Sequence, residues 1–205
     1  HEEKDERMNI VVCVKYVPDA QSDRTFSPDN TTDRVGVDGL LSELDEYAIE
    51  EALTIEGASE STVTVVCMGP EQAADAIRKA LQMGADAGVH ICDDALAGSD
   101  ALATSRVLAA AIRTLEYDLV LTGMASTDGL MSVVPAMLAQ QLGLPQVTFA
   151  GKVSFDGSTV RIERDGDTST EVIEASLPAL VSVTDQINEP RYPSFKGIMA
   201  AKKKP

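Results

Sequence analysis

The feature that most constrains the fold of this chain is a regular alternation of two kinds of segment over its first 145 residues. Short runs rich in β-branched residues, typical of buried strands, are each followed by a segment whose apolar residues recur at helical spacing. Strands are predicted over residues 9–15, 62–68, 89–92 and 118–122. Helices are predicted over 44–55, 73–81, from about 99 and over 130–138, with Gly57, Gly84 and Gly143 ending three of them. Such alternation indicates βαβ units around a mostly parallel sheet.

After Pro145 the pattern changes to closely spaced strands. The strands predicted there are residues 152–155, 159–162, 171–175 and 179–183. Asp156 and Gly157, between the first two, indicate a hairpin with a type I′ turn, so an antiparallel extension is expected over 151–184. The polar stretch 18–39 is expected to be a surface loop or an edge hairpin. The predicted fold class is α/β: a Rossmann-like, doubly wound, mostly parallel sheet with an antiparallel C-terminal extension.

The composition argues against several classes of partner. Acidic residues number 33 and basic residues 17, which gives a formal net charge of −16. Because proteins that bind nucleic acids or anionic membranes attract phosphates with cations, neither partner is expected. No apolar run approaches the roughly 20 residues that a bilayer-spanning helix needs, so no membrane insertion is expected. Cys13, Cys67 and Cys92 each lie in an apolar run, typical of buried reduced thiols in a cytoplasmic protein.

The sequence carries no pattern typical of a catalytic or metal centre. The phosphate-binding loop of nucleotide hydrolases, the dinucleotide fingerprint and the nucleophile elbow are all missing. His1 and His90 are too few for a multi-histidine metal site, and the cysteines lack the spacing of metal ligands. We therefore expect a protein without catalytic residues of its own and without a metal.

The most informative segment is the loop that follows the strand at 118–122. It runs from Gly123 to Val134, is rich in small and hydroxyl-bearing residues, and leads directly into a helix. Ligands of open parallel sheets bind at the carboxyl ends of the strands, and free backbone N–H groups at a helix N-terminus suit a phosphate. The alternative is an ordinary strand-to-helix connection capped by Ser126 or Asp128. The residues alone leave both interpretations open.

The C-terminal segment holds a second unusual feature. Phe195 stands between Pro193 and Gly197 in an otherwise polar stretch, where an aromatic side chain suits an interaction anchor. The alternative is that the segment folds back and Phe195 covers the core.

The two ends of the chain are expected to stand apart from the domain. Residues 1–7 are wholly polar and precede Met8, so we interpret them as an upstream extension or tag remnant. Residues 8–187 are expected to form a single adenine-nucleotide-binding α/β domain. Residues 188–205 are expected to form a partner-recognition loop and the start of a truncated C-terminal arm.

Several segments together resemble the beta subunit of electron transfer flavoproteins, from Met8 to Lys204. The resemblance depends on the order and spacing of these segments. They are IVVCVKYVPD at 10–19, DEYAIEEA at 45–52, MGP at 68–70, IRKALQMGAD at 77–86, DLVLTG at 118–123, LPQ at 144–146, ERD at 163–165, LPA at 177–179 and INEPRYPSFKGIMAAKKK at 187–204.

The resemblance implies a heterodimer whose alpha subunit holds most of the redox-active FAD, while the beta subunit holds a structural AMP. It implies that the adenine lies near Cys13 and Met68 and that the phosphate is bound between Ala125 and Val134. The positions that match the family's AMP site are Cys13, Ser42, Glu43, Leu44, Asp45, Met68, Gly123, Met124, Ala125, Ser126, Thr127, Asp128, Gly129, Leu130, Met131, Ser132, Val133 and Val134.

The resemblance also implies that the beta subunit docks acyl-CoA dehydrogenases and related dehydrogenases. Phe195 matches the position of an apolar anchor that inserts into the dehydrogenase. Asp165 matches an acidic position that pairs with an arginine of the mobile flavin domain. The full set of partner-binding positions is Asp165, Tyr192, Phe195, Lys196, Ile198 and Met199.

Two alternatives remain beside this interpretation. One subgroup of the family binds a second FAD in the beta subunit and bifurcates electrons, with a loop of the kind D-G-D-T-A-Q-x-G. Residues 128–134 carry apolar side chains where that loop has hydroxyls and amides, which favours AMP. The other alternative is a stand-alone adenine-nucleotide-binding module, such as a stress-sensor-like protein, which would have no need of the segment INEPRYPSFKGIM at 187–199.

Overall fold

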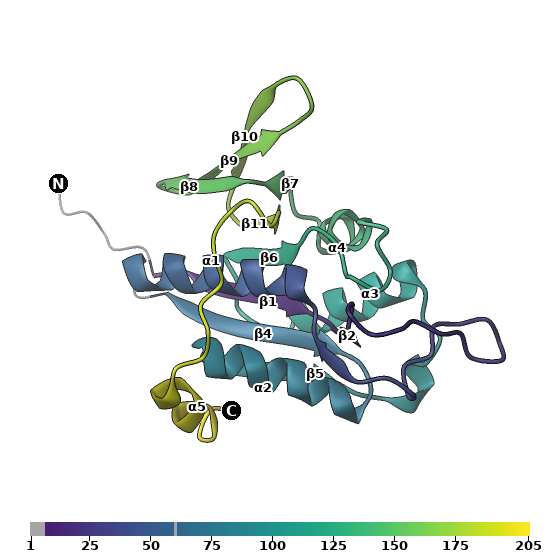
Figure 1. Ribbon diagram of the computed structural model, residues 1–205. Helices are drawn as coiled ribbons and strands as arrows, with labels where there is room; N and C mark the ends of the chain where they lie inside the picture. The colour runs from purple at the N-terminus through teal and green to yellow at the C-terminus, as the bar shows by residue number, and fades with distance from the viewer. Residues whose placement is uncertain (1–6, 60) are drawn as a thin grey trace.

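A central parallel sheet organises the chain in the computed structural model, which describes residues 7–59 and 61–205 (Figure 1). Its six strands lie in the order β5-β4-β1-β6-β11-β7, and every neighbouring pair is parallel. The strands are β1 (Asn9–Val14), β4 (Thr62–Met68), β5 (Ala87–Ile91), β6 (Leu119–Gly123), β7 (Gln146–Ala150) and β11 (Ala179–Val183). The predicted upstream extension at 1–7 lies outside the described residues except for Arg7.

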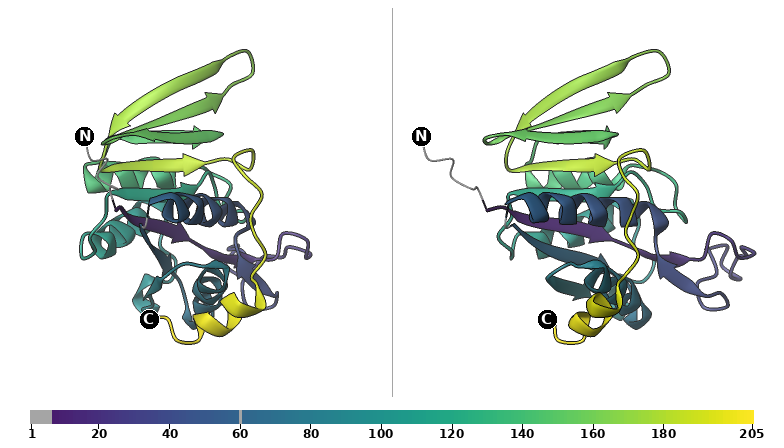
Figure 2. Two further views of the ribbon diagram at one scale, coloured as in Figure 1. Left: turned by 90° about the vertical axis from the view of Figure 1, so that its left-hand side faces the viewer. Right: turned by 60° about the vertical axis from the view of Figure 1, so that its left-hand side comes forward.

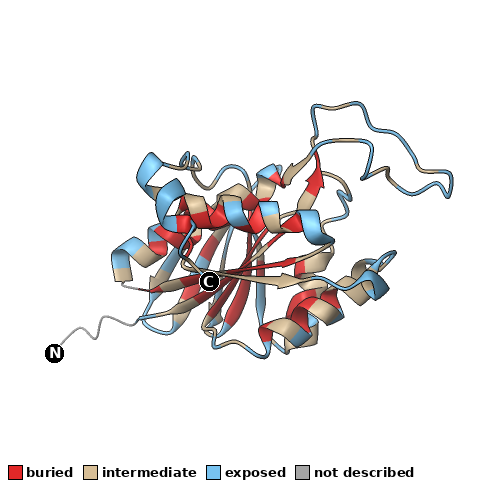
Figure 3. Ribbon diagram, turned by 90° about the horizontal axis from the view of Figure 1, so that it is seen from below, coloured by how far each residue is buried: buried red, intermediate tan, exposed pale blue. Residues whose placement is uncertain are grey.

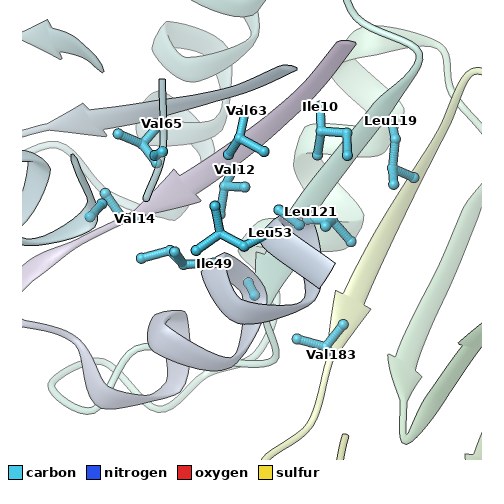
Figure 4. Packing of buried hydrophobic residues seen from close by; sticks show 14 of the residues in the cluster. Ile10, Val12, Val14, Ile49, Leu53, Val63, Val65, Leu119, Leu121 and Val183 are labelled. Carbon is cyan, nitrogen blue, oxygen red and sulfur yellow. The ribbon is translucent and has the colours of Figure 1, made fainter. Parts of the chain in front are cut away.

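Helices cover both faces of this sheet, which confirms the doubly wound prediction. The helices α1 (Glu43–Ser59) and α2 (Ala74–Met83) cover one face, and α3 (Ala101–Ile112) and α4 (Val134–Leu142) cover the other. Successive residues of β1 alternate between the two layers, with Ile10 and Val12 under α1 and Val11 under α3. Figure 4 shows Ile49 and Leu53 of α1 packed over these strands. Short 3-10 turns at Glu71–Ala73 and Asp94–Leu96 precede α2 and α3.

The strand order places a topological switch between β1 and β6. From β1 the chain builds outward through β4 to β5, then returns to lay β6 on the opposite side of β1. At such a point the connections leaving the two strands go to opposite faces of the sheet and leave a crevice at their carboxyl ends, where ligands of doubly wound folds bind.

The antiparallel extension is present but shorter than predicted. The strands β8 (Lys152–Asp156), β9 (Thr159–Asp165) and β10 (Thr170–Ser176) form a separate antiparallel sheet that stands beyond β7 (Figure 2). The expectation that it reaches residue 184 is wrong, because β11 returns to the parallel sheet beside β6. All five residues of β11 are buried, as in strands covered on both faces.

Three local predictions also need correction. The hairpin turn consists of Gly157 and Ser158, of which Gly157 alone has a positive φ, as in a type II′ turn rather than type I′. The helix α1 continues through Gly57 to Ser59, so Gly57 does not end it. Of the three cysteines predicted to be buried, Cys67 is buried, Cys13 is half-buried, and Cys92 is exposed because it follows the edge strand β5.

Two segments outside these layers bear on function. The strands β2 (Tyr16–Pro18) and β3 (Gly39–Leu41) pair antiparallel at the base of a long arm, residues 19–38, as the edge-hairpin alternative predicts. The arm extends from the carboxyl end of the sheet and is largely exposed (Figures 1 and 3). Residues Phe195–Ala201 form a short helix, α5, that packs against α2. Across the described ranges, no helix combines the length and apolar character that a bilayer crossing requires.

Candidate functional site

The predicted nucleotide-binding residues gather at the carboxyl ends of β1, β4 and β6. Cys13, near the end of β1, is paired in register with Thr122 of β6, and Met68 is the last residue of β4. The turn at 42–45 begins α1 beside them, since the backbone N–H of Ser42 donates to the carbonyl of Lys15 at 2.8 Å. The structure therefore brings the four separate parts of the predicted site to one edge, at the topological switch.

Gly123 fits this edge because it has no side chain. A Cβ at this position would lie 2.6 Å from Asp45 Oδ1 and 2.8 Å from the carbonyl oxygen of Leu44. Both contacts are too short for real Cβ atoms, and one of them is with backbone. The close approach of β6 to the start of α1 thus requires glycine at position 123.

The loop between β6 and α4 has the backbone geometry of an anion site. Leu130 and Ser132 both have positive φ angles, 58° and 56°, while Val133 has right-handed helical angles. A left-handed residue followed by a right-handed one, as at Ser132 and Val133, turns their successive N–H groups toward one side, as in the backbone nests that bind anions. Within residues 7–59 and 61–205, the N–H groups of Met131 through Val134 donate to no protein acceptor.

These angles also correct the predicted start of α4. The helix begins at Val134 rather than at Leu130, and Pro135 occupies its first turn. Leu130 and Met131 therefore belong to the loop, and both side chains are exposed. The side chain of Glu43 is exposed as well, and within the described residues no hydrogen bond or ion pair joins it to the site.

Several buried hydroxyl groups lie at the same edge of the sheet. Among the described residues, Ser42 Oγ, Thr122 Oγ1 and Thr127 Oγ1 are buried without a hydrogen-bond partner. Buried polar atoms are nearly always paired, so such orphans at one strand edge point to a polar ligand that pairs with them. Sequence reasoning missed Thr122 because it belongs to the strand, not to the loop, and no motif marks it.

Asp128 is held in an unusual environment at the centre of the loop. Its side chain is 0% exposed, and its Oδ2 lies 2.9 Å from Lys15 Nζ and 2.7 Å from Arg34 Nη1. Burial alone would raise the pKa of this carboxyl, but the Ser126 hydroxyl, Lys15 and Arg34 together hold it well below its usual range. Neither Lys15 nor Arg34 was predicted, because no local motif connects them with position 128.

Asp45 provides a contrasting buried carboxyl on the α1 side of the same edge. Its Oδ2 accepts a hydrogen bond from the backbone N–H of Lys15 at 2.8 Å. Burial raises the pKa of Asp45 to about 7, against the opposing effect of that hydrogen bond and of the Lys15 charge. Lys15 therefore connects the two carboxyls, through its backbone to Asp45 and through its side chain to Asp128.

The thiols at this edge are unreactive. Burial raises the pKa of both Cys13 and Cys67 to about 12, so neither forms the thiolate that nucleophilic chemistry needs. The Nε2 atom of His90 lies 3.1 Å from the carbonyl oxygens of Gly69 and Pro70, so this side chain pairs with the backbone of the turn after β4. Within the described ranges, no group of three or more His, Cys, Asp or Glu residues could hold a metal ion.

The predicted partner-binding residues divide between two separate places. Tyr192 and Phe195 are 92% and 80% exposed, and Ile198 and Met199 of α5 extend the same apolar surface. Of these four residues, Tyr192 also lines a groove of about 570 Å³ between β3, α1, α2 and residues 190–192. Asp165 lies elsewhere, at the end of β9, where it accepts a hydrogen bond from Thr170 Oγ1 at 2.6 Å.

The α5 segment folds back onto the domain, but Phe195 does not cover the core. Arg191 donates to Glu50 of α1 through its backbone N–H at 3.0 Å, Nε at 2.8 Å and Nη2 at 2.9 Å. Lys204 Nζ donates to the carbonyls of Gly84 and Ala85 at 2.8 and 2.7 Å. These contacts fix the segment at both ends and leave the aromatic side chain in solvent.

Comparison with known proteins agrees with this arrangement. The family model for the electron transfer flavoprotein domain matches residues 29–205. An electron transfer flavoprotein subunit beta from Mycobacterium tuberculosis H37Rv is 52% identical over 203 residues, covering 96% of this chain and 76% of the relative. The Clostridium acetobutylicum protein of the same name is 42% identical over 194 residues, covering 95% and 75%. A caffeyl-CoA reductase-Etf complex subunit, CarD of Acetobacterium woodii, is 38% identical over 200 residues, covering 97% and 76%. The chain therefore belongs to the beta-subunit family of electron transfer flavoproteins.

Proposed function

We propose that this chain is the beta subunit of a heterodimeric electron transfer flavoprotein that carries a structural AMP. Its role is to bind an alpha subunit and to dock dehydrogenases, so that their electrons pass to the FAD held mainly by the alpha subunit. The observation that carries the nucleotide assignment is the row of free N–H groups at Met131–Val134, placed at the topological switch.

The residues present fit an adenylate. The N–H groups of the loop and the positive end of α4 suit a phosphate, and the orphaned hydroxyls of Thr122 and Thr127 suit its oxygens or the ribose. Cys13 and Met68 offer apolar contact for an adenine at the strand ends. AMP has no redox chemistry, so its proposed role is to connect the separate strand ends and loops that line the site.

The docking proposal depends on the exposure of Phe195. A large aromatic side chain that is 80% exposed on a segment fixed at both ends is typical of an interface anchor. The names of the relatives associate them with flavoprotein subunits, which supports an electron carrier rather than an enzyme with its own substrate. Acyl-CoA and related dehydrogenases are the proposed donors.

The test is to identify the nucleotide that the full chain carries. Denaturation of the pure protein and chromatography of the supernatant should release one AMP per chain. Release of FAD would assign the chain to the bifurcating subgroup instead. Release of no nucleotide would overturn the assignment of the loop.

Replacing Ser126, Thr127 and Asp128 together by Ala should empty the site with the fold retained, because the loop loses its hydroxyls and its buried carboxylate. A matched control is available in the turn between β9 and β10. There Asp167, Thr168 and Ser169 are exposed residues of the same three types, and their replacement by Ala should leave the AMP content unchanged.

A further inference from the structure

Three basic side chains from the N-terminal part of the chain converge on the loop at 124–133. Arg24 Nη2 donates to the carbonyl oxygen of Thr127 at 2.7 Å. Arg34 Nη1 lies 2.7 Å from Asp128 Oδ2, and Lys15 Nζ lies 2.9 Å from the same oxygen. Lys15 follows β1, whereas Arg24 and Arg34 belong to the arm at 19–38.

These contacts are the means by which the arm is held in place. Within residues 7–59 and 61–205, each hydrogen bond or ion pair that joins residues 19–38 to another part of the chain ends on Thr127 or Asp128. The remaining bonds of the arm are internal, and its apolar side chains Phe26 and Val35 are exposed. The arm therefore has its base at the β2–β3 ribbon and its second attachment at the loop.

The second attachment is firmer than an ordinary surface ion pair. The Lys15 and Arg34 side chains are 43% and 48% exposed, but the Asp128 side chain between them is fully buried. A buried carboxylate with two cationic partners is screened little by solvent, and loss of a partner leaves it uncompensated. Asp128 also accepts from the N–H of Gly129 at 2.7 Å, so the junction fixes the backbone just before the positive-φ residues.

The charge of the junction favours an anion next to it. Lys15, Arg24 and Arg34 carry three positive charges against the negative charge of Asp128 and the carboxyl of Asp45, whose pKa burial raises to about 7. This local excess of positive charge lies on a chain whose formal net charge is −16. An anion drawn to this edge gains from the excess, while the acidic remainder of the molecule repels it.

We propose that the arm is a strap that holds the loop at 124–133 in its ligand-binding conformation. Arg24 and Arg34 are its positioning residues, and Asp128 is the junction through which they act. Opening of the strap frees the loop and sets the rate at which the bound nucleotide leaves. This inference rests on the proposed function, because it requires that the loop binds AMP.

Thermodynamic linkage between strap closure and AMP binding predicts a second measurable effect. If closure of the strap stabilises bound AMP, then AMP stabilises the closed strap by the same factor. Backbone amides of residues 24–36 should therefore exchange hydrogen more slowly when AMP is bound. A purely structural arm would show the same exchange with and without the nucleotide.

The decisive experiment is the release of radiolabelled AMP from the full chain, followed after a chase with unlabelled AMP. The double variant Arg24→Gln/Arg34→Gln should release AMP at least tenfold faster than the wild type. The single variant Arg34→Lys keeps the charge and retains Arg24, so it should release AMP nearly as slowly as the wild type. Asp128→Asn removes the junction itself and should also accelerate release.

Arg161→Gln is the matched control, since it breaks an exposed Arg–Glu pair with Glu174 in the β8–β10 sheet, away from the loop. It should release AMP at the rate of the wild type. If the wild type carries AMP but the double variant releases it no faster, the strap proposal is wrong while the proposed nucleotide site is supported. If the wild type carries no adenine nucleotide, the proposed site fails and the strap fails with it.

Discussion

At the scale of single residues, two glycines illustrate how context decides what a methyl group does. A Cβ at Gly123 would collide with the backbone of Leu44 and with Asp45, whereas nothing lies within 4 Å of a Cβ at Gly57 inside α1. We predict that Gly123→Ala destabilises the chain by about 1–3 kcal/mol, as overpacking in a fixed environment does. Gly57→Ala should stabilise it by up to about 1 kcal/mol, because alanine favours a helix interior. Urea unfolding measures both, and equal effects of the two variants would contradict the close approach at Gly123.

The buried carboxyl of Asp45 predicts a pH dependence of stability. Its pKa is raised to about 7 in the folded chain, so the folded state binds a proton that the unfolded state has already lost between about pH 4 and pH 7. Because the folded state binds more protons in this range, the free energy of unfolding falls as the pH rises, by at most about 1.4 kcal/mol per pH unit for this one group.

Asp45→Asn keeps an acceptor for the Lys15 N–H but no longer titrates, so its free energy of unfolding should fall less than that of the wild type between pH 4 and pH 7. Asp128 does not interfere, because its pKa is lowered and its effect appears only as the pH falls below that window. Urea unfolding at several pH values provides the measurement. Parallel pH profiles for the wild type and Asp45→Asn would show that Asp45 is ionised at both ends of this range.

At the scale of elements, the sequence predicted what local patterns encode and failed where distant contacts decide. The strand at 62–68 was predicted with its observed bounds, because a β-branched run and a following Gly-Pro define it locally. The predicted start of α4 was wrong, because apolar residues at 130 and 133 match a helix while their loop takes positive φ angles. The membership of β11 in the parallel sheet depends on its neighbour β6, about 60 residues earlier in the chain. The same holds for the junction of Lys15 and Arg34 with Asp128, whose partners lie too far apart in sequence for any motif.

The exposure of Phe195 at the start of α5 predicts that a mutation can weaken docking without lowering stability. Phe195 is 80% exposed, so Phe195→Ala should leave the melting temperature and the AMP content nearly unchanged. Burial of a phenylalanine at the centre of an interface contributes about 2 kcal/mol or more, so electron transfer from a docked dehydrogenase should slow by roughly tenfold or more. The measurement is reduction of the reconstituted heterodimer by the dehydrogenase at limiting concentration, beside a melting curve.

Phe26→Ala is the control for this prediction, because Phe26 on the arm at 19–38 is a phenylalanine of nearly the same exposure, 77%. It should change neither the melting temperature nor the rate of transfer. Unchanged transfer combined with a large fall in melting temperature for Phe195→Ala would show that Phe195 serves the fold instead.

At the scale of the whole molecule, the two proposed partner surfaces lie near opposite edges of the central sheet. The surface around Phe195 is carried by α5, which packs on α2 over the β4–β5 side. Asp165 belongs to the antiparallel sheet that stands beyond β7, at the other edge (Figure 2). The full width of the sheet separates them, and the proposed AMP site lies between, at the β1–β6 switch. One rigid sheet can therefore hold a dehydrogenase at one edge and a mobile flavin domain at the other.

This separation predicts that the two surfaces contribute independently. Asp165→Asn removes an exposed charge, and a surface ion pair with a flavin-domain arginine contributes about 0.2–1 kcal/mol, so transfer should slow by at most about fivefold and less at high salt. Because the sites share no partners, the double variant Asp165→Asn/Phe195→Ala should show the product of the two single effects. The reduction assay on the four proteins, at low and high salt, measures this directly. A double variant no slower than Phe195→Ala alone would mean that both residues act on one contact, which the width of the sheet does not allow for a rigid partner.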